Sequence, residues 1–129
     1  ISQLRSRHAE VARALLPAGR SRAGMLAHVA EVFQELEALA QGLRLLRELT
    51  PRTTDYLIAR GERLSARLFA EVLDQTGHKA KYVDAADLVH TDAAFGHASP
   101  DFGRTDRFVA AAAFQGLRLL PVVVLEYWG

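Results

Sequence analysis

The chain has 129 residues, half of them hydrophobic and about a quarter charged, which is the balance of an ordinary globular domain. Its 16 Lys and Arg against 15 Asp and Glu give a net charge of +1, which argues against a dedicated nucleic-acid binder. The sequence contains no cysteine, which excludes disulfides and Cys-ligated metals, and its longest apolar run, residues 119–125, is too short to span a membrane. We therefore expect a cytoplasmic protein with neither a nucleic-acid nor a membrane partner.

Two helices are predicted in the first 48 residues. The first has one face of residues at steps of four, three and four, and ends at Pro17: Leu4, His8, Val11 and Leu15. The second runs from about residue 22 to residue 48, and the alternating steps of its apolar stripe suit packing on a neighbouring helix. The stripe consists of Met25, Val29, Val32, Leu36, Leu39, Leu43 and Leu46. Residues 1–48 are thus predicted to form a helical hairpin without catalytic groups.

A third helix is predicted after residue 49. Thr50 suits the N-cap, and Pro51 suits the first helical position, where its missing N–H costs nothing. Gly77 supplies a left-handed stop. Between them runs one shared face: Leu57, Gly61, Leu64, Leu68 and Val72. The glycine at position 61 either kinks the helix into two or admits another backbone or a ligand.

The remainder of the chain alternates strand, turn and helix. A short strand is predicted over residues 79–83, turns follow, and a helix is predicted from about residue 105 to residue 117. Residues 121–125 form an apolar run typical of a strand buried in a parallel sheet. This order predicts an α/β fold class, a helical hairpin followed by part of a parallel sheet with flanking helices. We expect residues 1–129 to be a single domain or a partial domain, with the hairpin at 1–48 and an α/β segment at 49–129.

Other histidines and aspartates do not form a recognisable site. His8 and His28 lack the helical partner and the third ligand that a metal site needs. The loop carboxylates lack calcium-loop spacing and are expected to act as solvated groups and caps: Asp84, Asp87, Asp92 and Asp101. His90 and His97 have no partner that would make a nucleophilic triad, and Thr91 is expected to tie the turn between them. No metal site is therefore expected.

The most unusual feature is a Gly-Glu pair inside the third helix. Gly61 and Ser65 lie four residues apart on one face, where small side chains leave a groove, and Glu62 stands at its rim. A carboxylate there can receive a ligand ammonium group through a charge-assisted hydrogen bond. The same residues also fit a helix kink, with Glu62 paired to a surface arginine and the small residues admitting a packed helix. On these residues alone, both interpretations stay open.

Three motifs occur in order along the chain. They are Gly-Glu-Arg-Leu-Ser-Ala-Arg-Leu-Phe-Ala-Glu-Val-Leu at 61–73, Ala-Lys-Tyr-Val-Asp-Ala at 80–85 and Thr-Asp-Ala-Ala-Phe-Gly-His-Ala at 91–98. Their order and spacing resemble the middle of the aspartate kinase (aspartokinase) catalytic domain, which belongs to the amino-acid kinase family and is often fused to homoserine dehydrogenase. The resemblance is clearest over residues 49–101 and weaker on either side.

The resemblance implies a phosphotransferase. The family phosphorylates the β-carboxylate of L-aspartate with MgATP, the first step towards lysine, threonine and methionine, so ATP and Mg²⁺ are the implied cofactors of the full-length enzyme. Catalysis of this kind is largely positioning and electrostatic stabilisation. The implied partners are L-aspartate and either further copies of the chain, as a homo-oligomer, or the remainder of the parent enzyme.

The resemblance also implies substrate-binding residues. Glu62 matches the family's Gly-Glu carboxylate, which holds the α-amino group of the substrate, and Ile58 borders the same pocket. Tyr127 matches an aromatic residue that lines the aspartate site, although Glu126 stands where the family has a glycine. No catalytic and no metal-binding residue is carried over to this chain.

Two family motifs are missing from the sequence. The family's Lys-Phe-Gly-Gly-Thr-Ser strand has no counterpart, and neither does its Gly-Arg-Gly-Gly-Ser-Asp segment, which leads into the ATP-binding half. We therefore expect an internal fragment of an aspartate kinase, without kinase activity on its own. The alternative is a non-catalytic helical module that binds a partner protein through the stripe between Val29 and Leu46.

Overall fold

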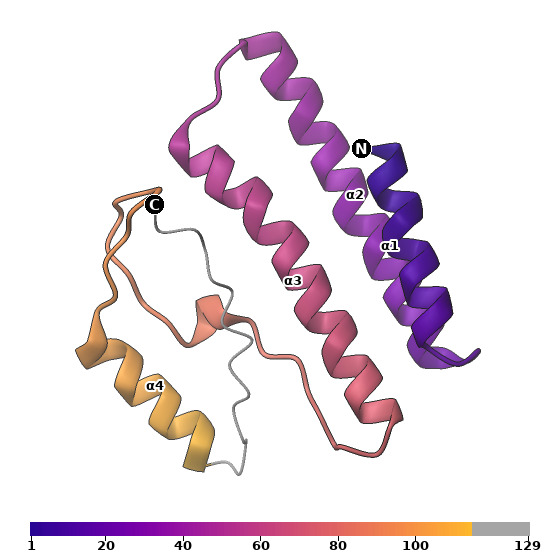
Figure 1. The fold of residues 1–129 in the computed structure, drawn as a ribbon. Coiled ribbons are helices and arrows are strands. Elements are labelled where there is room, and N and C mark those ends of the chain that lie inside the picture. The colour runs from indigo at the N-terminus through magenta and orange to yellow at the C-terminus, as the bar shows by residue number, and fades with distance from the viewer. Residues whose placement is uncertain (115–129) are drawn as a thin grey trace. The chain divides into compact units, whose positions relative to one another are not determined.

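The computed structural model describes residues 1–114, which form four α-helices and one short 3-10 turn (Figure 1). These are α1 (Ser2–Leu15), α2 (Arg20–Leu46), α3 (Pro51–Gln75), η1 (Ala85–Asp87) and α4 (Phe102–Phe114). The chain divides into two compact units, Ile1–Tyr82 and Val83–Gly129. We call them the first and second units and describe each by itself. The number of domains stays a prediction.

Local signals set the ends of the three helices in the first unit. The Thr50 hydroxyl accepts a hydrogen bond from the Thr53 N–H at 3.2 Å, so Thr50 is the N-cap of α3, with Pro51 in its first turn. Helix α2 ends where Arg47 turns left-handed, at φ 53°. The chain turns left-handed again at Gly77, at φ 88°, just after α3. The predicted helices of this unit are confirmed, with ends within a few residues of expectation.

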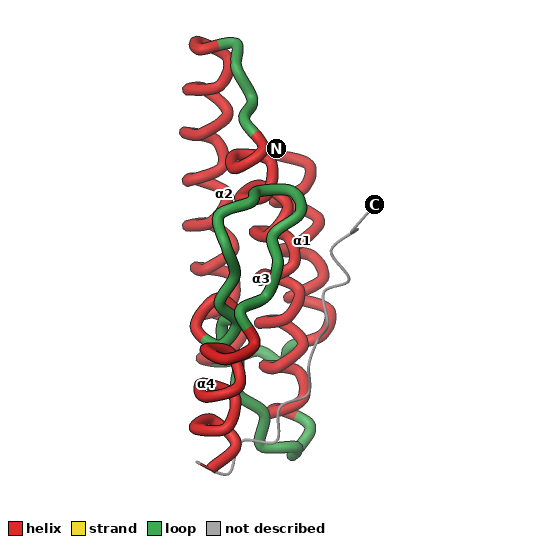
Figure 2. Tube along the Cα trace, turned by 90° about the vertical axis from the view of Figure 1, so that its left-hand side faces the viewer, coloured by secondary structure: helices red, strands yellow, loops and turns green. Residues whose placement is uncertain are grey.

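The parallel sheet is wrong for the described part of the chain, which contains helices and loops but no strand (Figure 2). The strand expected at 79–83 is irregular chain instead, and Lys79 has a left-handed φ of 46°, which a strand residue cannot adopt. A single strand also needs a neighbour to pair its backbone groups, and the only strand-like pairing among residues 1–114 is an antiparallel bridge between Thr91 and Pro100. The strand predicted at 121–125 lies outside the described residues. The α/β fold class is therefore corrected to a helical architecture for residues 1–114.

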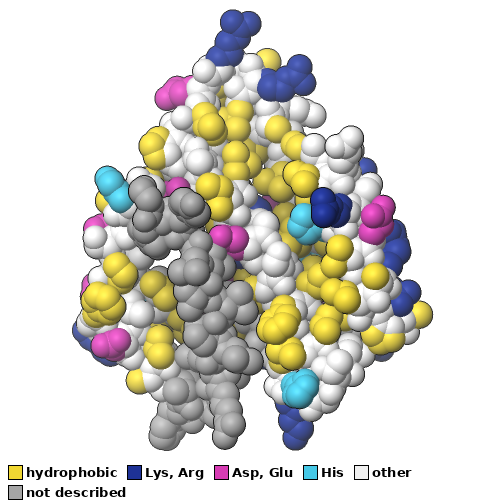
Figure 3. Space-filling view, viewed as in Figure 1, with side chains coloured by type: hydrophobic (Ala, Val, Ile, Leu, Met, Phe, Trp, Pro, Cys, Tyr) yellow, Lys and Arg dark blue, Asp and Glu magenta, His cyan; other side chains and the backbone are white. Residues whose placement is uncertain are grey.

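Helices α1, α2 and α3 run in alternating directions along the chain, and α1 and α3 each pack against α2. Many hydrophobic side chains stay at the surface, including a group over α2 and the start of α3 (Figure 3). The face predicted to bury α1 is among them, because Leu4 is 55% and Leu15 54% exposed. Instead, the buried residues are Ala12 within α1 and Leu16, the residue that follows its last turn. The small side chain at position 12 is compatible with a close approach of α1 to α2.

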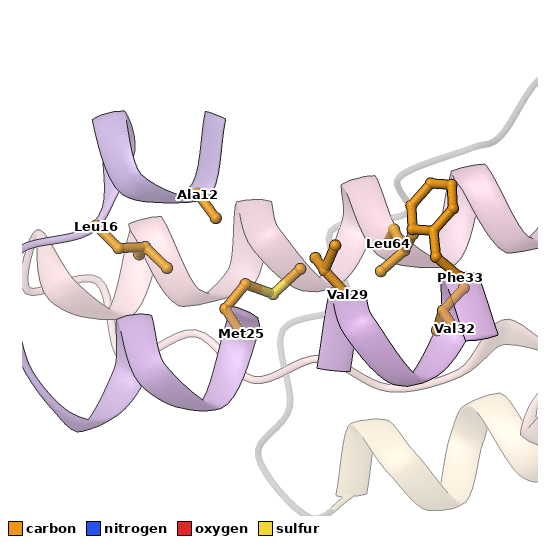
Figure 4. Packing of buried hydrophobic residues seen from close by; sticks show 7 residues of the cluster. All are labelled: Ala12, Leu16, Met25, Val29, Val32, Phe33 and Leu64. Atoms are coloured by element: carbon orange, nitrogen blue, oxygen red, sulfur yellow. The ribbon is translucent and has the colours of Figure 1, made fainter. Parts of the chain in front are cut away.

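The buried cluster of the first unit is small and centred on α2 (Figure 4). It consists of Ala12 from α1, Leu16 just after that helix, Met25, Val29, Val32 and Phe33 from α2, and Leu64 from α3. Three of these, Met25, Val29 and Val32, belong to the predicted stripe of the second helix. The first half of that stripe therefore faces the core, as its spacing indicated.

In the second unit, hydrogen bonds close the loop that precedes α4. The Asp92 carboxylate accepts hydrogen bonds from the backbone N–H groups of Ala94 and Ser99, and the Thr91 hydroxyl donates to the Asp92 carbonyl. Asp101 caps α4 by accepting from the Arg104 N–H at 3.1 Å. This cap explains why α4 begins at Phe102, before the predicted start at residue 105. The expected roles of the loop aspartates and of Thr91 are confirmed for these residues.

Candidate functional site

The Gly-Glu pair lies in the middle of α3, which continues unbroken through Gly61. A side chain at position 61 would meet no other atom within 4 Å. The Ser65 hydroxyl, one turn later, donates to the Gly61 carbonyl at 3.0 Å. The glycine therefore neither divides the helix nor receives a protein backbone within the described residues, and it leaves an open position on the surface of α3.

Ile58 and Glu62 lie on the same side of α3, because residues four apart lie one above the other on a helix. Ile58 is 53% exposed, and Glu62 is partly buried. Glu62 lies two residues before the buried Leu64, which corresponds to a rotation of about 200° around the helix. Ile58 and Glu62 thus lie on the side of α3 away from Leu64, whereas Gly61, three residues before Leu64, lies between the two sides. Tyr127 and its neighbour Glu126 lie outside the described residues.

The opposite side of α3 is fixed to α2 by polar contacts. Arg60 makes an ion pair with Glu35 at 3.1 Å, its guanidinium lies 4.4 Å from the centre of the Tyr56 ring, and it donates a hydrogen bond to the Tyr56 hydroxyl. Near the end of α3, Glu71 accepts a hydrogen bond from the Ser21 hydroxyl at 2.5 Å. These contacts hold the helix that presents Ile58 and Glu62. They join residues 25 and 50 positions apart, so no local sequence pattern indicates them.

Two surface hollows of the first unit lie beside the three helices, and the lining of each leaves out Ile58 and Glu62. One, of about 320 Å³, lies over α1 and α2 with Arg5, Glu10 and Arg13 in its lining. The other, of about 180 Å³, lies where α1, α2 and α3 meet, and it reaches Ser65, the last residue of the open turn. Its other lining residues are Arg7, His8, Val11, Met25, Val29, Leu64 and Leu68. Sequence periodicity gave no sign of this hollow, because its shape depends on how three helices pack together and not on the spacing within one of them.

Among residues 1–114, no three His, Asp or Glu side chains lie close enough together to hold a metal ion. None of the described helices is both long and apolar enough to cross a membrane. His90, in the second unit, packs its ring against Phe108 at 4.6 Å, and its backbone N–H donates to the Thr105 hydroxyl. These contacts hold the start of the loop against α4.

Comparison with known proteins returns aspartokinases. The chain is 45% identical to aspartokinase 3, chloroplastic, of Arabidopsis thaliana over 60 residues, which is 46% of this chain and 11% of that protein. It is 32% identical to the lysine-sensitive aspartokinase 3 of Escherichia coli strain K12 over 95 residues, 70% of this chain and 20% of that protein. An aspartokinase of Schizosaccharomyces pombe is 40% identical over 55 residues, 43% of this chain and 11% of the relative.

The chain thus spans between about a tenth and a fifth of the length of the curated relatives it matches. No protein-family model matches the sequence, and no solved structure matches it. The identities over these stretches are nevertheless 32–45%, which is enough to show a relationship. This chain contains a region related to the aspartokinases.

Proposed function

We propose that this chain is part of an aspartate kinase and that α3 is its substrate-recognising helix. The observation that carries the proposal is the outer face of α3, where Glu62 and the exposed Ile58 lie next to an open position at Gly61 in an aspartokinase-related region. The proposed reaction is transfer of a phosphoryl group from ATP to the β-carboxylate of L-aspartate. The proposed setting is the cytoplasm, as expected from a sequence without cysteine.

In this proposal, Glu62 accepts charge-assisted hydrogen bonds from the α-ammonium group of aspartate. Ile58 covers the apolar carbon atoms of the substrate and excludes water beside the carboxylate, which strengthens the ionic contact. Tyr127 is proposed as a further lining residue. Together, these groups would orient the substrate, and orientation is a large part of what phosphoryl transfer requires.

ATP and Mg²⁺ supply the phosphoryl group and neutralise its charge in phosphoryl transfer. The residues described here do not fit these groups: no metal-holding cluster occurs in residues 1–114, and the sequence lacks the lysine- and glycine-containing motifs of the family. We derive no step through them. The expected result is that the 129-residue chain binds aspartate but releases no ADP from ATP in a coupled assay with L-aspartate. ADP release that depends on aspartate would contradict this expectation.

The substrate role of Glu62 is tested by comparing L-aspartate with succinate, which lacks the ammonium group. Titrations followed by NMR chemical shifts should show tighter binding of aspartate to the wild-type chain, because only aspartate can donate to Glu62. Glu62→Gln should remove this preference. Asp74→Asn is the matched control, because it makes the same charge change at the exposed end of the same helix and should keep the preference. Equal affinity for both acids in the wild-type chain would reject the role of Glu62.

A second candidate function is a helical module that binds a partner protein. The exposed leucines at the α2–α3 connection favour it: Leu45 is 85%, Leu46 75% and Leu49 58% exposed. The first half of the predicted stripe is buried in the first unit, so only its far end remains for a partner. A module of this kind would show no thermal stabilisation by aspartate, whereas a ligand that binds the native state alone raises its stability.

A further inference from the structure

Three polar residues of α2 lie seven positions apart along the side that meets α3. They are Ser21, His28 and Glu35, and a spacing of seven keeps them on one flank of the helix. The outer two contact α3, since Ser21 donates to Glu71 at 2.5 Å and Glu35 pairs with Arg60 at 3.1 Å. We call this line of contacts the polar flank.

His28 occupies the middle of the polar flank. On α3, Arg67 lies four residues before Glu71 and seven after Arg60, so it belongs to the same side of that helix. The His28 side chain is only 26% exposed, and its Nδ1 lies 3.7 Å from a Glu31 oxygen one turn further along α2. The histidine is thus partly enclosed between two contacts that fix α3 to α2.

The charges around His28 are unbalanced. Burial is the largest cause that lowers the pKa of His28 from its ordinary value of 6.5, followed by the positive charge of Arg67 and, more weakly, of Arg60. Glu31 acts in the opposite direction, but it is 73% exposed, so water screens its attraction. Glu35 is engaged with Arg60, and no titratable group of α1 is among the charges that act on His28 within the described residues.

We propose that His28 makes the packing of α3 on α2 sensitive to pH. The neutral imidazole fits between the polar contacts, whereas its protonated form adds a positive charge beside Arg67 and Arg60 and loosens α3. This device is independent of the proposed function.

Helix α3 is well placed to respond to such a charge. Leu64 is its single contribution to the fully buried cluster, with Leu68 and Val72 only partly buried beside it. Few apolar contacts therefore oppose a repulsion along the polar flank.

The direction of the pH effect follows from the lowered pKa. As the pH falls below 6.5, the unfolded chain binds a proton at His28 before the native chain does. The stabilisation is therefore fully present above the unfolded pKa and is lost as the pH falls through the lower native pKa. Acidification should weaken the first unit.

The test is thermal unfolding between about pH 7.5 and about pH 5.5, the range in which histidine titrates. The wild-type melting temperature should fall more on acidification than that of His28→Gln, which cannot titrate at this position. Arg67→Glu should reduce or reverse the fall, because the new carboxylate attracts the protonated imidazole. Arg44→Glu, in the last turn of α2 and away from the polar flank, is the matched control and should keep the wild-type slope.

An NMR pH titration of the His28 ring keeps the proposal falsifiable if Arg67→Glu does not fold. The wild-type ring should titrate below 6.5. Equal melting slopes for the wild type and His28→Gln, or a His28 ring that titrates at or above 6.5, would overturn the proposal.

Discussion

The two sides of α3 have opposite properties. On the inner side, Leu64 is 2% exposed, and Arg60 and Glu71 are tied to α2 by an ion pair and a hydrogen bond. On the outer side, Ile58 is 53% exposed, and at Gly61, on the boundary between the two sides, a side chain would meet no atom within 4 Å. Structural needs explain the inner residues, whereas an exposed isoleucine and a glycine in mid-helix contribute little to stability. The outer side is therefore where a function has to be sought.

The largest expected effect on this comparison is that of Leu64→Ala. Removing the one fully buried side chain of α3 should lower the free energy of unfolding by about 2–5 kcal/mol, as measured by urea denaturation. The matched change on the outer side, Ile58→Ala, should cost within about 0.5 kcal/mol, because exposed side chains contribute little. Equal losses at the two positions would contradict the assignment of an inner and an outer side.

Removing the N-cap of α3 should lower the free energy of unfolding by a smaller amount. This loss is common to the inner and outer sides, because the cap stabilises the start of the whole helix. Thr50→Ala leaves the Thr53 N–H without its side-chain acceptor and should lower the free energy of unfolding by about 1 kcal/mol. Thr50→Ser keeps the hydroxyl and serves as the control. A loss of the same size with serine would show that the hydroxyl is not what stabilises the helix start.

The smallest expected effect has the opposite sign. Gly61→Ala should raise the free energy of unfolding by about 0.5–1 kcal/mol, because alanine favours the helix and its methyl group meets no atom within 4 Å. In the same variant, aspartate affinity should fall, since the methyl group would occupy the open position beside Glu62. A variant that is less stable than the wild type would show that the position is not open.

Local signals made the helices predictable from the sequence, and long-range contacts limited the rest. Thr50 and Pro51 set the start of α3 through bonds within four residues, so the pattern sufficed. The buried side that the sequence predicted for α1 was wrong. Packing with α2 buries Ala12 and Leu16 and leaves Leu4 and Leu15 exposed. That choice depends on a partner helix and not on the spacing within α1.

The predicted sheet failed for a related reason. Only Tyr82 and Val83 of residues 79–83 favour a strand, a strand requires a neighbour, and the left-handed Lys79 prevents a regular start. For the candidate site, Glu62 and Ile58 were named from the resemblance to aspartate kinases, and their spacing of four residues places them on one side of α3. Its support could not be predicted, because Arg60 finds Glu35 across the α2–α3 contact.

The central claim, that the outer side of α3 recognises aspartate, is tested most directly by mapping backbone amide shifts of the wild-type chain as L-aspartate is added. The account predicts that the largest shifts occur at Ile58, Gly61 and Glu62, while the amides of Arg60, Leu64 and Glu71 on the inner side move less. The largest shifts on the inner side, or no shifts in α3, would contradict it.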